Sequence, residues 1–395
     1  MTNVNGLRQK IEKASSMLRQ NGIIGGGKIV SGYLKTYSKA FFVGSGDILF
    51  VTGGVGDKAH YRAFGPAEEL TRHGFKCAVT VADNPNLPKC ADKFKIFIFH
   101  KVNLSKKAEQ LVCEIKKQNK EIIFDTDDLD FDPRYLKDMD YFSRIGPAER
   151  EEFEKGIGSW LLYDSYVKTC TTTVSYLANK LKEKDKRVII VPNKLSDKEL
   201  ELADKIIEKN KSEDEFIRLG YYSGTLSHNK DFATITDALI SILEKYEKVK
   251  LILAGPLDTE DELNKFSDRI EILPRVPRDK YYENLYKCDI NLVPLEFGNP
   301  FCESRSEIKF IEAGILKIPT VAVKNRTYSE AIADGADGFL AASTEEWIEK
   351  LSKLIEEDNF RKSMGEKARE KVLKDYTNKN SHDQEYYDYI KSKIR

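Results

Sequence analysis

Short apolar segments alternate with helical segments along the chain, and this alternation occurs twice. The first series of apolar segments covers residues 47–53, 76–81, 95–99, 121–124 and 187–191. The second series begins after a Pro-Asn pair and covers residues 216–222, 249–254, 270–273, 289–293 and 320–323. Strands separated by helices form parallel βαβ units, because a parallel strand pair needs a long crossover connection. The sequence therefore predicts an α/β chain with two doubly wound sheets.

Two successive domains follow from this pattern, since 395 residues exceed what one hydrophobic core organises. We expect a basic helical N-terminal extension over residues 1–45, a first domain over 46–193 and a second domain over 194–360. Helices over 361–395 are expected to pack back on the first domain. Ligands of doubly wound sheets bind at the carboxyl ends of the strands. Two facing domains thus predict a site between them, with one substrate on each wall.

The composition narrows the classes of function. The 64 basic residues (Lys and Arg) equal the 64 acidic residues in number, so no nucleic-acid partner is expected. The six cysteines form no CxxC pair, and no group of Cys and His has the spacing of zinc ligands, so we expect reduced thiols and neither a metal nor a cofactor. The sequence shows no signal peptide and no apolar run of membrane-spanning length, which predicts a cytoplasmic protein.

The N-terminal region is basic. Apolar residues between Val4 and Leu18 recur at helical spacing, and Arg8, Lys10 and Lys13 lie among them. Such a helix either lies on an anionic membrane surface or packs on the body of the protein. Both interpretations stay open, and the first includes a weak contact with the inner face of the plasma membrane.

The segment 299–323 carries the pattern that says most about chemistry. It has the order loop, helix, Gly/Pro turn and buried strand, with Ser304 or Ser306 placed to cap the helix. The unpaired N–H groups of a helix start suit a diphosphate. Lys309 lies one turn after Ser306, and Glu312 follows on the same face. We expect Lys309 to face the anion and Glu312 to accept hydrogen bonds from two neighbouring ribose hydroxyl groups; a surface Lys–Glu pair is the alternative.

These residues are part of a longer resemblance. The run Ser306-Glu-Ile-Lys-Phe-Ile-Glu312, followed by Ile-Pro-Thr-Val, resembles the donor-binding segment of the retaining glycosyltransferase family 4, also called group 1. It is similar to the subset with an S-x-[IL]-K-x-x-E motif. Further segments resemble motifs of the same family in the same order: 220–231, 251–256, 289–294 and 330–340. The resemblance implies the GT-B fold, in which two Rossmann-like domains face each other across a cleft.

The resemblance also assigns residues on the donor side. Glu312 matches the family's ribose-binding glutamate, and Lys230 matches its phosphate-binding lysine. Gly224 and Thr225 lie in the segment that resembles the phosphate-binding loop, with Thr225 where the family has arginine. One of the two expected cations is therefore absent at its usual place.

A second departure concerns the family's E-x7-E motif. Ser304 stands where the first glutamate is expected, and Glu303 is one residue away and would replace it if the loop shifts. In the closer subset, Ser306 and Lys309 would serve the diphosphate. Arg305, His228 or Lys309 would compensate for the missing arginine. These departures leave the donor sugar and the stereochemical outcome open.

The first domain offers a glycine-rich loop. Gly53, Gly54 and Gly56 follow the first strand in Thr-Gly-Gly-Val-Gly-Asp, which is similar to the family's first glycine-rich loop. Glycines allow backbone N–H groups to come close to a ligand. We expect this loop to approach the donor from the opposite wall.

The first domain also offers an aspartate cluster. Asp127 and Asp128 follow another strand in Phe-Asp-Thr-Asp-Asp, and either would orient an acceptor hydroxyl or act as a base. The alternative is a turn cluster, which aspartate favours. Asp-Thr-Asp also spells the metal-binding DxD of the other glycosyltransferase fold, and we interpret that match as coincidental.

Together these patterns predict a glycosyltransferase (EC 2.4 type) that moves a sugar from a nucleotide-diphosphate sugar to a glycan or lipid-linked glycan acceptor. Catalytic roles are expected for Asp127, Asp128, Lys230 and Lys309, without a metal and with retention at the sugar carbon. Cell-surface polysaccharide assembly is the expected context. Two alternatives stay open: a GT-B-fold nucleotide-sugar epimerase or hydrolase, and a non-catalytic partner subunit.

Overall fold

The computed structural model describes residues 31–56, 59–139, 142, 145–209, 211, 214–224 and 229–394. Most of the expected N-terminal extension, residues 1–30, lies outside the described residues. Residues 31–39 are helical.

The first domain is built on a parallel six-stranded sheet with the order β2-β1-β3-β4-β5-β6. Its strands are β1 (Ile48–Thr52), β2 (Cys77–Val81), β3 (Ile96–His100), β4 (Glu121–Thr126), β5 (Thr169–Thr172) and β6 (Arg187–Ile190). Its helices include a π-helical turn (His60–Phe64), α3 (Gly65–Arg72), α4 (Lys106–Lys117), α5 (Pro147–Glu154), α6 (Ser159–Leu162) and α7 (Ser175–Lys182). Strands β1 and β3 are buried along their whole length, as expected where both faces of a parallel sheet are covered.

The second domain repeats this architecture with the strand order β12-β11-β10-β7-β8-β9. Its strands are β7 (Ile217–Tyr222), β8 (Val249–Ala254), β9 (Ile270–Leu273), β10 (Ile290–Val293), β11 (Thr320–Val323) and β12 (Phe339–Ala341). Its helices include α8 (Asp197–Ile207), α9 (Asn229–Ala233), α10 (Thr236–Lys245), α11 (Arg278–Leu285), α12 (Pro300–Glu303), α13 (Ile308–Gly314), α14 (Arg326–Ala331), α15 (Thr344–Glu356) and α16 (Asp358–Asp375). The predicted fold class, α/β with two doubly wound sheets, is confirmed.

Each sheet separates two hydrophobic clusters, because successive side chains of a strand point to opposite faces. In β1, Leu49 and Val51 join the cluster that also contains residues of α4. Ile48 and Phe50 join the cluster on the other face. The alternation therefore anchors helices on both faces of the sheet.

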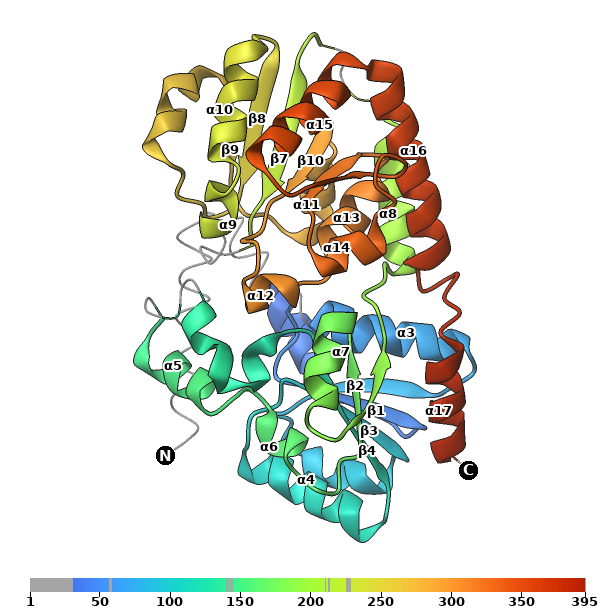
Figure 1. The fold of residues 1–395 in the computed structure, drawn as a ribbon. Coiled ribbons are helices and arrows are strands. Elements are labelled where there is room, and N and C mark those ends of the chain that lie inside the picture. Colours follow the sequence, from blue (N-terminus) through green and yellow to red (C-terminus); the bar gives the residue numbers. More distant parts are fainter. Residues whose placement is uncertain are drawn as a thin grey trace.

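The chain crosses between the domains twice. Ser196 caps α8 with a reciprocal capping box, and Ala203 of that helix packs in a core cluster of the second domain. The C-terminal segment crosses back, and α17 (Gln384–Ile394) packs against the first sheet through Tyr386 and Ile390. Figure 1 shows α16 along the upper domain and α17 along the lower one.

The expectation that residues 361–395 return as a whole to the first domain needs a correction. Met364 and Val372 of α16 pack in clusters of the second domain, so only α17 returns. A buried ion-pair cluster fixes the crossing, since Lys194 Nζ lies 2.9 Å from Glu69 and 2.5 Å from Asp383.

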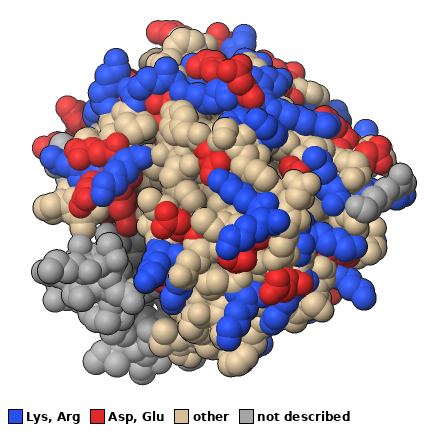
Figure 2. Space-filling model, turned by 90° about the horizontal axis from the view of Figure 1, so that it is seen from below, with Lys and Arg blue, Asp and Glu red and all other residues tan. Residues whose placement is uncertain are grey.

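The surface of the first domain carries both signs of charge. Figure 2 shows basic and acidic side chains interspersed on the face seen from below. Among the described residues, no helix has both the length and the apolar character needed to cross a membrane.

Candidate active site at the domain junction

The carboxyl ends of the two sheets contribute loops that meet between the domains. Arg305 of the second domain lies 3.8 Å from the Asp128 carboxylate of the first. Asn193 Nδ2 donates to Ser306 Oγ at 3.0 Å. The structure thus brings together candidate residues that the sequence placed on opposite walls.

The segment that leads into α13 is anchored to the first domain. Asn299 caps α12 by accepting from the Phe301 N–H, and its amide donates to the Asp138 carbonyl at 2.9 Å. Phe301 packs in a core cluster of the first domain. This short helix therefore sets the position of the residues that follow it, Arg305 and Ser306 among them.

The expected serine cap of α13 is wrong. Helix α13 begins at Ile308 after Glu307, which makes no side-chain cap. Ser304 Oγ donates to the Phe301 carbonyl within the α12 turn, and Ser306 Oγ accepts from Asn193. Because a separate short helix precedes α13, Ser304 ends that helix and does not start the next.

Lys309 has the most unusual environment of the candidate residues. Its Nζ is buried, has no hydrogen-bond partner among the described residues and lies 4.4 Å from the centre of the Tyr221 ring. Burial lowers the pKa of Lys309 to about 8, while the Asp231 carboxylate opposes that shift and Arg305 adds to it. A buried ammonium without an acceptor suits an anionic ligand.

Glu312 lies at the same junction with both carboxylate oxygens engaged. Its Oε1 accepts from the Tyr61 hydroxyl at 2.6 Å and from Arg278 at 2.9 Å, and its Oε2 accepts from the Tyr281 hydroxyl at 2.7 Å. Tyr61 comes from the first domain, so this carboxylate links the two walls. The alternative of a surface pair with Lys309 is wrong, since Glu312 is buried.

A second buried carboxylate extends this network. Glu199 of α8 lies 2.5 Å from Arg278 and 3.0 Å from His60 Nε2, and it accepts from the Tyr282 hydroxyl at 3.2 Å. Burial alone would raise the pKa of Glu199, but the hydrogen bonds from His60 and Ser196 outweigh burial and lower it. Arg278 therefore bridges the carboxylates of Glu199 and Glu312.

On the opposite wall, the first aspartate of the Asp-Thr-Asp run is bound internally. Asp125 accepts from Arg62 at 2.5 and 3.1 Å, from Thr171 at 2.7 Å, and lies 2.9 Å from His100 Nδ1. Burial would raise its pKa, yet Arg62 and His100 lower it. The imidazole of His100 separates Asp125 from Asp127, which is 4.0 Å from Nε2, so the two carboxylates of this run do not converge.

The remaining aspartates surround one lysine. Lys101 Nζ lies 2.9 Å from Asp127, 3.8 Å from Asp128 and 2.5 Å from Asp130. Burial would lower the pKa of Lys101, but these carboxylates raise it well above its usual range. Asp128, which also faces Arg305, is the member of the cluster that meets the second domain.

The glycines and the loop residues differ in their surroundings. A Cβ on Gly53 would lie 2.5 Å from the Lys101 carbonyl, so close packing of two strand ends requires this glycine. Gly54 faces the Tyr33 hydroxyl, and open space surrounds Gly56 and Gly224. Three further candidates belong to the β7–α9 connection: Lys230 is exposed on α9, and Thr225 and His228 lie outside the described residues.

The sequence analysis missed Tyr61, Arg278 and Tyr281. Tyr61 lies 251 positions before its partner Glu312. Residue spacing within one segment gives no signal for contacts between distant segments. The only signal in the sequence was a basic residue, Arg278, at the start of α11.

Comparison with known proteins gives a match that covers most of the second domain. Residues 203–371 match the family model described as glycosyl transferases group 1. This chain is a glycosyltransferase. A comparison with curated protein sequences gives no significant match.

Solved structures with the GT-B fold resemble this glycosyltransferase along most of its length. A glycosyltransferase from Rickettsia africae is 14% identical with a TM-score of 0.60, over 89% of this chain and 100% of that one. HepE from Anabaena, in complex with UDP, is 14% identical with a TM-score of 0.58, over 88% and 100%. Sucrose-phosphate synthase from Thermosynechococcus elongatus is 14% identical with a TM-score of 0.55, over 84% and 95%. At these identities the likeness establishes the fold.

Proposed function

We propose that this glycosyltransferase moves a sugar from a nucleoside diphosphate sugar to a hydroxyl group of a glycan or lipid-linked glycan. The observation that carries the proposal is the Lys309 ammonium, which is buried and has no acceptor among the described side chains. An oxygen of a diphosphate would supply that acceptor, and Arg305 is close enough to shift the pKa of Lys309. The similar Anabaena structures in complex with UDP and with UDP-glucose support a nucleoside diphosphate sugar as the donor.

The donor ribose is proposed to bind Glu312. Two tyrosine hydroxyls, from Tyr61 and Tyr281, now donate to the two oxygens of this carboxylate. Two neighbouring ribose hydroxyls make the same pattern of donors. We infer that the ribose replaces at least the Tyr61 hydroxyl, which belongs to the opposite wall.

The proposed chemistry needs charge stabilisation more than a strong base. As the bond between the sugar carbon and the diphosphate oxygen breaks, Lys309 and Arg305 stabilise the negative charge on the leaving group, with Lys230 at its edge. The acceptor oxygen bonds to the sugar carbon, and its proton passes to the departing diphosphate on the same face. This route gives retention and needs no metal ion. Asp127 and Asp128 orient the acceptor hydroxyl from the first domain.

The proposal extends to the acceptor class and to the location of the protein. The basic residues of the segment 1–45 support a contact with the inner face of the plasma membrane and a role in cell-surface polysaccharide assembly. Release of sugar from labelled donor without any acceptor would instead favour a hydrolase.

The proposal is tested by nucleotide binding and transfer in Lys309→Ala. Calorimetric titration with UDP, ADP and GDP identifies the nucleotide that the native protein binds. Removing one charge-assisted contact from a buried site costs about 1.5–3 kcal/mol, so we expect affinity to fall by about ten- to a hundredfold and transfer to be lost.

The matched control is Lys367→Ala, an exposed lysine on α16. It should bind and transfer as the native protein does, and circular dichroism should show that both variants are folded. Native affinity and native transfer in Lys309→Ala would contradict the proposed function, as would binding of no nucleotide by the native chain.

A further inference from the structure

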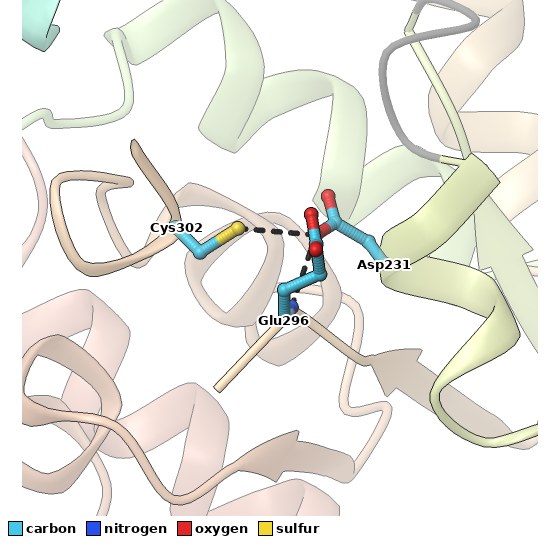
Figure 3. Close-up of side chains that lie close together, drawn as sticks. All are labelled: Asp231, Glu296 and Cys302. Carbon is cyan, nitrogen blue, oxygen red and sulfur yellow. Dashed lines mark hydrogen bonds between the residues drawn. The ribbon is translucent and has the colours of Figure 1, made fainter. Parts of the chain in front are cut away.

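Three polar side chains from separate segments converge beside the proposed diphosphate site. Asp231 follows Lys230 on α9, Glu296 follows β10, and Cys302 lies on α12 (Figure 3). Asp231 Oδ1 accepts from the Glu296 backbone N–H at 3.1 Å and from the Cys302 thiol at 3.1 Å. Their ligand atoms all lie within 4.8 Å of one another, and Asp231 is only 3% exposed. These hydrogen bonds connect the loop between β10 and α12 to helix α9, which carries Lys230.

The chemistry of this cluster disfavours a metal ion. Burial and the Asp231 carboxylate raise the pKa of the Cys302 thiol, so it stays protonated and donates to Asp231. A cysteine binds metals as the thiolate. The Asp231 carboxylate also interacts with the Lys309 ammonium, since it raises the pKa of Lys309 against the effect of burial. A fixed cation already supplies the positive charge that a metal would bring.

Lys309 is the independent observation that points to a ligand here. Its buried Nζ lacks a hydrogen-bond partner among the described residues and is coupled by charge to Asp231. A ligand at this position must offer an anionic oxygen to Lys309 and hydroxyl groups to the neighbouring carboxylates. A sugar attached to a phosphate has both features.

We propose that Glu296 recognises the transferred sugar by accepting hydrogen bonds from its hydroxyl groups, and that Asp231 and Cys302 position Glu296. This inference rests on the proposed function, because it assigns the sugar end of the same donor. Glu296 is partly exposed, whereas Asp231 and Cys302 are buried, so Glu296 is the member that meets the ligand. Asn299 Nδ2 donates to Glu296 Oε1 at 3.1 Å and orients the carboxylate.

The geometry also distinguishes Glu296 from Glu303, the acid that the sequence offers in place of the glutamate absent at Ser304. Glu303, the nearer neighbour in sequence, has its carboxylate facing the backbone N–H of Arg326 at 3.3 Å, on the side of α14. Ser304 Oγ is used within α12. Glu296 lies eight residues earlier in the chain, yet it is held beside Asp231.

The experiment compares each nucleoside diphosphate with its sugar conjugate. Calorimetric titrations use the pairs UDP and UDP-glucose, ADP and ADP-glucose, and GDP and GDP-mannose, on the native protein, Glu296→Gln and Glu303→Gln. We expect the native protein to bind one conjugate more tightly than its nucleotide. The ratio of these two affinities is the gain from the sugar. In Glu296→Gln, we expect this gain to fall by about tenfold while the affinity for the nucleotide alone is unchanged, because a charged acceptor becomes a neutral amide. Glu303→Gln should keep the gain.

Positioning by Asp231 and Cys302 has its own readout in the same titrations. Cys302→Ser keeps a donor to Asp231 and should keep the gain, whereas Cys302→Ala should lose part of it without changing nucleotide affinity. An undiminished gain in Glu296→Gln, or its loss in Glu303→Gln instead, would overturn the inference and leave the proposed function intact. Binding of no nucleotide by the native protein would overturn both.

Discussion

At the scale of single residues, Lys309 is expected to make the proposed nucleotide binding depend on pH. Burial lowers the pKa of Lys309 from 10.5 to about 8, so the free protein loses this charge at a lower pH than a protein with an exposed lysine would. Only the charged form attracts a diphosphate. We expect nucleotide affinity, measured by calorimetry, to fall as the pH rises above about 8, by at most about tenfold per unit.

Lys309→Arg separates this effect from a general loss of structure, because arginine stays charged to high pH. Its affinity should stay flat between pH 8 and pH 10. The same decline in both proteins would show that another group controls the pH dependence.

Glu307 is expected to make the free energy of unfolding depend on pH. Burial raises its pKa from 4.5 to about 7, and its Oε2 has no hydrogen-bond partner among the described residues. A carboxyl whose pKa is higher in the folded state stabilises the fold below pH 4.5, and this contribution is lost as the pH rises through 7. Glu307→Gln mimics the protonated form. We expect it to raise the free energy of unfolding at pH 8 by up to about 3 kcal/mol and to have little effect at pH 4.5.

Urea denaturation at the two pH values measures this difference. Glu303→Gln, a neighbouring acid that is not fully buried, serves as the control and should show no such pH dependence. A Glu307→Gln variant that is destabilised equally at both values would contradict the assignment.

The donor-side residues show which contacts a sequence pattern can reveal. Lys309 and Glu312 lie on one short helix, so their spacing predicted that both would reach one site. The surroundings of Glu312 depend on Tyr61 and Arg278, which are distant in sequence and meet it only through the domain junction. Local spacing therefore placed Lys309 and Glu312 on one helix, and it missed the network of contacts around Glu312.

At the scale of elements, α12 shows a similar limit. The sequence predicted a loop before one helix, whereas the chain forms two helices in succession. Pro300 suits the first turn of a helix, and Asn299 caps it. These local signals for α12 were present in the sequence. The packing of Phe301 in the same core cluster as Leu136 and Met139 was not predictable, because no local pattern connects those residues to α12.

Removing the Phe301 ring should loosen this anchor. The side chain is 5% exposed and packs in the first domain, so Phe301→Ala leaves a cavity between α12 and that core. We expect a loss of about 3–4 kcal/mol in the free energy of unfolding and weaker nucleotide binding, because α12 positions the residues that follow it.

Phe297→Ala is the matched control, since Phe297 lies in the loop before α12 and its side chain is 74% exposed. It should change neither property by more than a few tenths of a kcal/mol. Equal effects of the two substitutions would show that α12 is not anchored as described.

At the scale of the whole molecule, the sequence predicted two domains and their order but not how they meet. Alternation of strands and helices is a local signal that repeats in each half. The relative placement depends on long-range pairs such as Tyr61 with Glu312, Ser175 with Glu330, and Lys194 with Asp383. These pairs, with the return of α17, hold the two domains together without nucleotide.

Nucleotide binding should loosen this closed arrangement. Since a ribose on Glu312 would replace the Tyr61 hydroxyl, binding removes one contact between the domains, and we expect small-angle X-ray scattering to show a larger radius of gyration with nucleotide than without. Tyr61→Phe removes the competing hydroxyl in advance. It should show the larger radius without nucleotide and bind nucleotide about fivefold more tightly, which corresponds to about 1 kcal/mol. Tyr163→Phe, an exposed tyrosine of the same domain, should change neither value. A radius that shrinks on binding, or weaker binding by Tyr61→Phe, would mean that Tyr61 closes over the ribose as part of the donor site and does not compete with it.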